Sequence, residues 1–457
     1  MSLRVEPSEP AQRGRRLAAL TALALLFLAA TVAGSIGLAH YRHPYVVAVM
    51  LCQAPLYGAA AWLVLRHGHG LRSGPTLLVI LGTAILARAV LLPLPPISTD
   101  IYRYIWDGRV QADGINPYRF LPADPRLQHL RDGTIYRGIN RADTAPTIYP
   151  PAAQMIFLAA TRIAETVTVM KAALVAFEGL VVWGLVGWLR SRGLPPARLL
   201  LYLWHPLPLW EIAGSGHVDA AAIGLMWAAL LAAERRKPGW AGMLLALGAG
   251  VKYFPAFVAP ALYRRFGWRI PATFAATIAA IYLPYLGAGW GVFGYLSGYA
   301  QEEGLSAGGG VFWLALVGTL WPPAAAALAK PYLATAALCL LGLGIAIALR
   351  SRPERVSLAG AQWLLVAFIV AMTPHYPWYI MCLVPFLCIA PTYGVAYLTL
   401  AAPLLYGMVW PFSRFPSEAL IYLPFVALVA VDALLRRGAG RRRESLDGSR
   451  SGPRPAA

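Results

Sequence analysis

Apolar runs about as long as a bilayer is thick recur from one end of the 457-residue chain to the other. A helix needs about 20 apolar residues to cross the hydrocarbon core of a membrane. Runs of roughly this kind lie at residues 17–39, 45–65, 76–94, 199–213, 218–233 and 421–435. Because backbone polar groups in lipid must be satisfied within a helix, the sequence predicts an all-α polytopic membrane protein with about 12–14 spans.

The positive charge of the chain follows the pattern of a membrane protein and not that of a nucleic-acid-binding protein. Only 13% of residues are charged, against about a quarter in soluble domains. The net charge of +19 is concentrated near the two ends and in short loops such as "RSRGLPPAR", "ERRK" and "RSRPER". Basic short loops mark the cytoplasmic side of a membrane. The sequence predicts a cytoplasmic basic tail at 1–16, one membrane domain at 17–436, and a basic, disordered cytoplasmic tail at 437–457.

One long polar segment lies between the spans, at residues 97–150. Counting basic loops from a cytoplasmic N-terminus places this segment on the non-cytoplasmic side, after a third span that ends at Pro93–Pro96. It holds six of the nine aspartates of the chain: Asp100, Asp107, Asp113, Asp124, Asp132 and Asp143. This concentration of carboxylates is the strongest functional signal in the composition.

The loop begins with a predicted helix, in "STDIYRYIWDGRVQADGINPY" (98–118). Proline disfavours a helix at its own position and just before it, so the third span ends there and Ser98 or Thr99 can cap a new helix. One face of that helix carries Asp100, Arg103, Tyr104 and Asp107 at i, i+3, i+4 and i+7. We expect an amphipathic helix along the membrane surface. By periodicity alone, this face is as consistent with a solvated ladder of ion pairs as with a catalytic site.

Three later segments place polar side chains beside apolar runs. Lys252, in "LALGAGVKYFPAFVAP", is either a snorkelling lysine or a functional charge. His217 and Asp219 follow a glycine-containing turn and are either a helix cap or ligand-binding groups. In "MTPHYPWY", the aromatic side chains form either an interfacial belt or a platform for sugar stacking; these residues are His375, Tyr376, Trp378 and Tyr379.

Four segments in order resemble the GT-C superfamily of membrane glycosyltransferases. They are "TDIYRYIWDGRVQADGINPY" with "IYPPAAQMIF", "WHPLPLWEIAGSGHVDAAAIG", "GAGVKYFPAFVAP" and "TPHYPWYIMCLVPF", and together they extend from about residue 95 to residue 390. The resemblance is to enzymes that depend on polyprenyl-phosphate-mannose, such as bacterial α-1,6-mannopyranosyltransferases and the first mannosyltransferase of GPI-anchor assembly.

The resemblance implies transfer of a hexose, mannose above all, from a polyprenyl-phosphate donor to a glycan or lipid acceptor, with inversion, at the non-cytoplasmic face of a bacterial-type plasma membrane. Asp100 matches the aspartate that acts as base, and Asp107 matches a second acidic position. Candidates to bind the donor phosphate are Lys252, Arg103 and Arg109. Candidates to bind substrate are Glu211, His217, Asp219, Tyr149, His375, Tyr376, Trp378 and Tyr379.

The sequence departs from its relatives at one position that bears on cofactors. Some relatives carry Asp-x-Asp, a spacing suited to a metal ion, but here Tyr102 takes the second place. A monophosphate leaving group can be neutralised by arginine and lysine alone. We therefore expect no required cofactor, and a divalent metal is the less favoured alternative.

Two other functions stay open at this stage. Transfer of a different sugar by the same mechanism is one, because no residue pattern in the sequence indicates the configuration at C2 of the sugar. A transporter or flippase of lipid-linked sugar is the other; it would be expected to show charges at mid-membrane and internal repeats. The concentration of acidic groups in one loop favours the glycosyltransferase.

Overall fold

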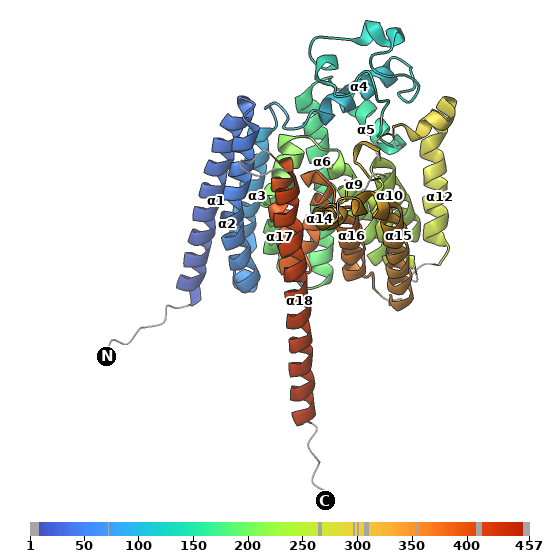
Figure 1. Ribbon diagram of the computed structural model, residues 1–457. Coiled ribbons are helices and arrows are strands. Elements are labelled where there is room, and N and C mark those ends of the chain that lie inside the picture. Colours follow the sequence, from blue (N-terminus) through green and yellow to red (C-terminus); the bar gives the residue numbers. More distant parts are fainter. Residues whose placement is uncertain are drawn as a thin grey trace, which may run out of the picture.

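The computed structural model describes residues 9–450 except for residues 72, 264–266, 296–297, 299–300, 306–309, 352–354 and 408–413. Within these residues the chain forms helices and no strand, so the predicted all-α fold is confirmed (Figure 1). Seven of the described helices are long and apolar enough to cross a membrane, and shorter apolar helices accompany them.

The first three helices lie at one edge of the bundle, on the left in Figure 1. They are α1 (Glu9–Ala39), α2 (His43–His67) and α3 (Ser73–Leu91), with α1 packed against both others. At the centre, α9 (Asp219–Glu234) packs between α6 (Val167–Ser191) and α10 (Pro238–Val251). Nearly every residue of α9 is buried, as expected for an apolar helix surrounded by protein on all sides.

The rest of the bundle surrounds this centre. Its helices are α12 (Arg269–Tyr282), α14 (Phe312–Leu320), α15 (Ala324–Arg350), α16 (Leu358–Met372), α17 (Tyr393–Ala401) and α18 (Arg414–Arg450). Short 3₁₀ segments join them: η6 (Phe254–Ala261), η7 (Leu283–Phe293), η8 (Pro377–Tyr379), η9 (Met381–Cys388) and η10 (Ala402–Tyr406).

The apolar run at 199–213, expected to be one continuous span, is broken instead. It is divided among the end of η4 (Pro196–Leu199), α7 (Leu200–Leu203), α8 (Pro206–Pro208) and most of the π-helical η5 (Leu209–Gly214). The two prolines in "HPLP" remove backbone donors and interrupt the helix. The whole run is buried, which is the setting in which irregular backbone is tolerated within a membrane domain.

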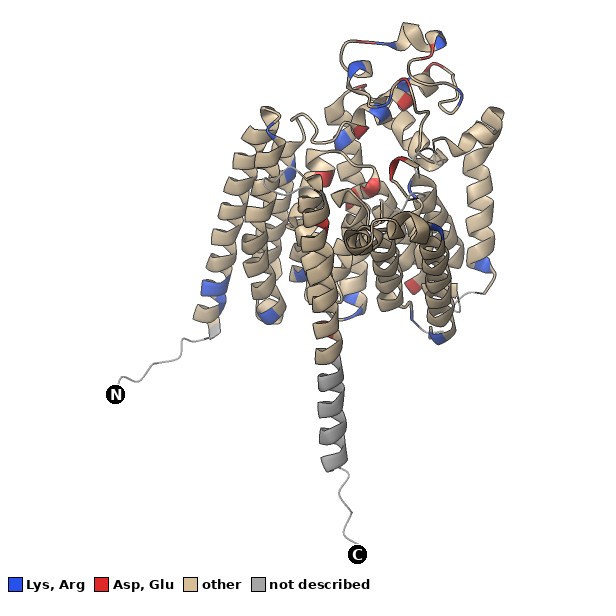
Figure 2. Ribbon diagram, in the orientation of Figure 1, with Lys and Arg blue, Asp and Glu red and all other residues tan. Residues whose placement is uncertain are grey.

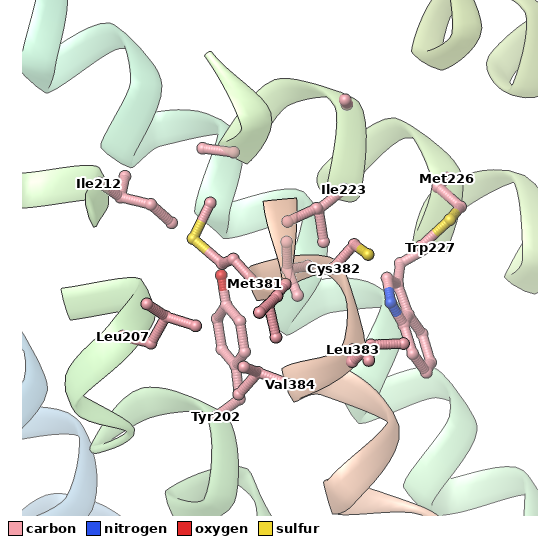
Figure 3. Close-up of a cluster of buried hydrophobic side chains, with 14 of the residues drawn as sticks. Tyr202, Leu207, Ile212, Ile223, Met226, Trp227, Met381, Cys382, Leu383 and Val384 are labelled. Carbon is pink, nitrogen blue, oxygen red and sulfur yellow. The ribbon is translucent and has the colours of Figure 1, made fainter. Parts of the chain in front are cut away.

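The broken segment packs against η9, a 3₁₀ helix that contains Pro385. Figure 3 shows this contact as a cluster of apolar side chains, with Leu207 and Ile212 on one side, Met381 and Val384 between, and Trp227 of α9 on the other. Trp227 and Phe386 pack at 4.9 Å between ring centroids. The close-packed centre thus fixes two irregular segments, the broken run at 199–213 and η9.

The loop at 97–150 covers one end of the bundle, at the top of Figure 1, and the first turns of α1 and the last turns of α18 lie toward the opposite end. It contains α4 (Asp100–Ala112), η2 (Pro125–Leu130) and η3 (Tyr136–Gly138), and it leads into α5 (Pro151–Thr161). In Figure 2 the acidic residues gather mainly in the half of the molecule that carries this loop.

The helix predicted from Asp100 is present, but its surroundings differ from the expectation. It packs against α5 and α6, and most of its residues, including Arg103 and Asp107, are buried. A solvated ladder of charges is therefore wrong for this face. The apolar residues between the charged positions are buried against the neighbouring helices, and Asp107 has protein partners on both carboxylate oxygens.

Both predicted tails are partly helical. The first helix begins at Glu9, within the tail expected at 1–16, and α18 continues to Arg450, within the tail expected to be disordered from 437. Arginine, which favours helix, is the commonest residue in both stretches. Adding residues to an existing helix avoids the unfavourable nucleation step.

Candidate active site

A cavity of about 480 Å³ lies beneath the loop, where α4 begins and α10 ends. Its walls come from residues 97–100, the loop at 140–150, the end of α10 and the turn after α16. Seven of the predicted site residues line it: Asp100, Arg103, Tyr149, Lys252, Tyr376, Trp378 and Tyr379. Segments up to about 310 residues apart in the sequence, from Ile97 to Tyr406, thus meet at one site.

Asp100 is the first residue of α4 and lies at the cavity wall. Its backbone N–H donates to Ser98 Oγ at 3.3 Å, so Ser98 supplies the predicted side-chain cap while Thr99 occupies the N-cap position without such a bond. Asn140 Nδ2 donates to Asp100 Oδ1 at 3.4 Å and to Thr99 Oγ1 at 3.2 Å. The carboxylate therefore lies near the positive end of a helix, which favours its charge, with one long bond to the loop.

Arg103 and Asp107 form an ion pair one turn further along α4. Arg103 Nε donates to Asp107 Oδ1 at 2.9 Å, and Nη1 donates to the Ala145 carbonyl at 3.0 Å. Gln154 Nε2 donates to the other carboxylate oxygen at 3.0 Å. Arg103 lines the cavity, whereas Asp107 is 2% exposed and does not. The carboxylate thus holds the guanidinium in place, and the fixed fork geometry leaves donors that can bind an anion.

Lys252 closes the opposite wall of the cavity. It follows α10 in an extended conformation, and its Nζ donates to both carboxylate oxygens of Asp219 at 2.8 Å. It also lies 4.1 Å from the centroid of the Tyr379 ring, a cation–π contact. Asp219, the first residue of α9, is 1% exposed. The ammonium is thus fixed at the cavity edge by a buried partner, which differs from a lysine that snorkels to water.

The aromatic residues near 376–379 form a stack. The Trp378 ring packs against His217 at 4.0 Å and against Tyr376 at 4.5 Å between centroids. Trp378 is only 8% exposed, so most of its ring is covered by protein and little is left for a sugar to stack on. An aromatic belt at the membrane surface would leave more of the ring uncovered.

A buried polar group lies behind this stack. Tyr406 lines the cavity, and its hydroxyl contacts both carboxylate oxygens of Glu211 at 2.9 Å. His217 Nε2 lies 3.2 Å from Glu211 Oε2, and both side chains are almost fully buried. Glu211, His217 and Asp219 therefore do not line the cavity; they support Tyr406, Trp378 and Lys252, which do.

Arg109, predicted to bind phosphate, lies away from the cavity. Its guanidinium donates to Asp132 at 2.8 Å, to Glu165 at 2.7 Å and to the Leu130 carbonyl at 2.9 Å. Burial acts to raise the pKa of Asp132, but the bond from Arg109 and those from the Tyr136 and Thr134 amides lower that pKa to about 2. These contacts tie the loop to the start of α6, so Arg109 acts on loop structure in this arrangement.

His375 is also outside the lining. Its Nδ1 lies 2.6 Å from Glu303 Oε2, and its Nε2 lies 2.7 Å from the Gly310 carbonyl. Close by, Arg141 pairs with Glu302 at 2.8 Å. These contacts join the loop after α16 and the loop at 97–150 to the segment that follows η7.

Sequence reasoning missed several residues of the cavity wall. Asn140, Arg141, Tyr295 and Tyr406 line it and lie in loops or in a 3₁₀ segment without periodicity. Tyr295 reaches the site because its backbone N–H donates to the Thr147 carbonyl at 3.1 Å. The asparagine and arginine stood within the acidic loop already singled out, so proximity in sequence was the one available signal; the two tyrosines carried none.

A second, apolar cavity of about 940 Å³ lies beside the first. Residues of α10, η6, α12, α15 and α16 line it, and Phe368 of α16 lines both cavities. The Phe368 ring stacks on Phe257 at 4.3 Å. The cavity beneath the loop and this apolar groove therefore share an aromatic boundary.

Tyr102, at the second position of a would-be Asp-x-Asp, packs beneath the loop. A Cβ atom on Gly138 would lie 2.6 Å from Tyr102 Cγ, so this glycine lies directly on the ring. Among the residues that the structure describes, no group of three or more histidine, cysteine, aspartate or glutamate side chains is arranged to hold a metal ion.

Comparison with known proteins gives a family. The model of the family described as "alpha-(1→6)-mannopyranosyltransferase, N-terminal domain" matches residues 16–265. Alpha-(1→6)-mannopyranosyltransferase A of Mycobacterium tuberculosis is 25% identical over 333 residues, which cover 65% of this chain and 62% of that protein. The matched region thus spans less than two thirds of the relative. No solved structure matches.

Proposed function

Because this chain belongs to the alpha-(1→6)-mannopyranosyltransferase family, we propose that it transfers mannose from a polyprenyl-phosphate donor to a glycan or lipid acceptor. The reaction would occur in the cavity beneath the loop at 97–150, on the non-cytoplasmic face of the membrane. The observation that carries the proposal is the meeting of Asp100 with two fixed cations, Arg103 and Lys252, around one cavity next to an apolar groove.

Asp100 is proposed as the general base. Its carboxylate takes the proton of the acceptor hydroxyl as that oxygen forms a bond to the anomeric carbon. The bond from this carbon to the phosphate oxygen breaks at the same time, and its electron pair leaves with the phosphate. Attack opposite the leaving group inverts the configuration at the anomeric carbon.

Arg103 and Lys252 are proposed to stabilise the negative charge on the leaving phosphate. Each is already held by a buried carboxylate, Asp107 or Asp219, so neither has to reorganise when charge develops. These carboxylates also offset most of the positive charge of the cavity. A phosphodiester with a single negative charge therefore suits the site.

The apolar groove is proposed to bind the polyprenyl chain. Phe368, which stacks on Phe257 of the groove, lies at the boundary with the cavity beneath the loop. This is where an isoprenoid chain would join its phosphate. Apolar walls remove such a chain from water or exchange it with membrane lipid.

The orientation in the membrane rests on charge. Arg66, Arg190, Arg192, Arg235 and Arg350 lie at or just beyond the ends of α2, α6, α9 and α15, and basic short loops favour the cytoplasm. The loop at 97–150 lies at the other end of the bundle (Figure 2), which supports a non-cytoplasmic active site.

The test is transfer by the purified protein. The protein is incubated with polyprenyl-phosphate-mannose or polyprenyl-phosphate-glucose and a lipid extract, and products are identified by mass spectrometry. We expect a mannosylated product, and loss of turnover by a factor on the order of 10²–10⁴ in Asp100→Asn. Unchanged turnover in Asp100→Asn overturns the assignment of the base. Transfer of glucose alone supports the alternative sugar. A flippase is supported if the protein neither transfers nor hydrolyses the donor but moves it intact across a vesicle membrane.

A further inference from the structure

We propose that Lys171 is a positioning residue that fixes the connector at 92–99 and thereby aims Asp100 into the cavity. Neither the fold nor the proposed reaction requires a lysine at this place. The kinetic part of its test rests on the proposed function, and a second part does not.

Lys171 lies near the start of α6 with a side chain that is 0% exposed. Its Nζ donates to the carbonyl of Leu94 at 2.8 Å and lies 3.4 Å and 3.5 Å from the carbonyls of Leu91 and Pro95. The described structure gives it no carboxylate partner. A buried ammonium held by carbonyls alone is costly, and a charged side chain within a membrane domain is a functional candidate by default.

The connector that Lys171 holds has few bonds of its own. Pro93, Pro95 and Pro96 have no N–H to donate. In the described part of the chain, the backbone N–H of Leu94 donates to Leu91, and the next backbone bond of this kind is made by Tyr102. The ammonium therefore supplies the donors that the three prolines lack, at the point where the chain leaves α3.

The stem of Lys171 also touches the elements around Asp100. A Cβ atom on Gly216, which has φ +78°, would lie 3.1 Å from Lys171 Cγ and 2.4 Å from Ile101 Cδ1. The lysine stem, the turn at Gly216 and the first turn of α4 are thus in close contact. A displacement of Lys171 would reach Asp100 from both sides, through the connector and through Ile101.

The consequence for the reaction follows from distance. Asp100 lies five residues after Pro95, and a general base acts only within hydrogen-bond reach of the proton that it takes. A misplacement of about 1 Å costs on the order of a hundredfold in rate. Loss of the ammonium should therefore lower kcat. Donor binding should change little, because Lys252 and the apolar groove lie outside α4 and Arg103 is held separately by Asp107 and the Ala145 carbonyl.

The kinetic test compares Lys171→Met with Lys330→Met. Methionine keeps an unbranched stem but removes all three donors, and Lys330 is an exposed lysine of α15 that serves as the matched control. We expect a fall in kcat of about tenfold to a hundredfold for Lys171→Met, with KM for the donor little changed, and wild-type kinetics for Lys330→Met.

The second test measures the position of residue 100 without any reaction. Asp100→Cys is introduced where the two exposed cysteines, Cys52 and Cys339, are alanine, and the rate of labelling by a water-soluble thiol reagent is measured. Adding Lys171→Met should change this rate. A cysteine in place of Tyr295, on a different wall, should react equally fast with either residue at 171.

Each outcome of the two tests either supports or overturns the proposed role of Lys171. Altered labelling at 100 with unaltered labelling at 295 supports the proposal, even if no mannose is transferred, in which case the proposed function alone fails. Unchanged labelling at 100, or equal changes at both positions, overturns it, as does a kcat equal to that of wild type. If Lys171→Met does not fold, Lys171→Gln, which keeps a shorter amide donor, is judged by the same criteria.

Discussion

Two buried arginine–carboxylate pairs in this molecule, Arg88–Glu178 and Arg103–Asp107, are chemically alike but differ in their surroundings. In the bundle, Arg88 donates to both oxygens of Glu178 at 2.7 Å and 2.9 Å, and to two backbone carbonyls at 3.1 Å. The Tyr202 hydroxyl donates to the same carboxylate at 3.2 Å. At the cavity wall, Arg103 donates to one oxygen of Asp107 and to one carbonyl, and in the described structure its Nη2 has no protein partner.

The difference lies in what each pair leaves unfilled. The bundle pair is closed, because Nε, both terminal nitrogens and both carboxylate oxygens have protein partners, and it joins α3 to α6. The cavity pair is open, because part of the guanidinium faces a space that a ligand can occupy. We infer that burial of a charge pair alone does not mark a functional site; unfilled donors beside a cavity do.

The largest expected effect is on the closed pair. Glu178→Gln leaves Arg88 buried without its anion, and breaking a buried pair costs about 3–5 kcal/mol. We expect the free energy of unfolding in detergent to fall by about that amount, while turnover per folded molecule stays at the wild-type level. A fall in turnover without a fall in stability would remove the distinction between the two pairs.

The second prediction exchanges arginine for lysine in each pair. Arg103→Lys keeps a positive charge beside Asp107 but loses the planar guanidinium, part of which faces the cavity. Turnover should therefore fall by about tenfold to a hundredfold, with little change in stability. Arg88→Lys is the matched variant and should lower the thermal midpoint instead. The comparison fails if both variants lose activity, or both lose stability, to the same extent.

The third prediction concerns the boundary between the cavity beneath the loop and the apolar groove. Phe368→Ala removes the side chain shared by the polar cavity and the apolar groove. We expect the preference for long polyprenyl donors over short ones to weaken by about tenfold, in line with about 1–3 kcal/mol for lost apolar contact in a pocket. Competition between donors of two chain lengths measures it, and an unchanged preference would place the lipid elsewhere.

The smallest effect is expected from pH. The pKa of Asp132 in the folded protein, about 2, lies below its ordinary value of about 3.9. The contribution of its contact with Arg109 is therefore complete above about pH 4 and is lost as pH falls toward 2. Amide protection factors in the loop at 124–138, which correct exchange for its intrinsic dependence on pH, should fall over this window in the wild type. In Asp132→Asn, exchange should be high already at neutral pH.

The sequence allowed much of the cavity-lining set to be predicted, for identifiable reasons. Proline at 95 and 96 followed by residues at i, i+3, i+4 and i+7 indicated α4, and Lys252 was conspicuous in an apolar run. The broken segment at 199–214 was missed because its composition is as apolar as that of a span, and tertiary packing decides whether such a run stays helical. Asn140 and Tyr406 were missed because loop residues reach a site through contacts that have no periodicity.

The sequence predicts positions more readily than the surroundings of a side chain. From the sequence, Trp378 is a candidate platform for a sugar and Arg109 a candidate phosphate ligand. The structure covers the first with His217 and Tyr376 and surrounds the second with Asp132 and Glu165. Whether a side chain is available to a ligand depends on its neighbours in space, which one sequence does not specify. Lys171, deep in an apolar run, was missed for the same reason.

The contact between Tyr102 and Gly138 constrains how this protein can diverge. An aspartate at 102 would recreate the Asp-x-Asp spacing of some relatives, but it would also remove the ring that fills the space beneath η3. The intermediate sequence would combine a void with a carboxylate two residues from Asp100. A larger residue at 138 cannot come first, because its Cβ atom would lie 2.6 Å from Tyr102 Cγ. A mutational path between the two sequence types therefore needs the changes at 102 and 138 to occur together.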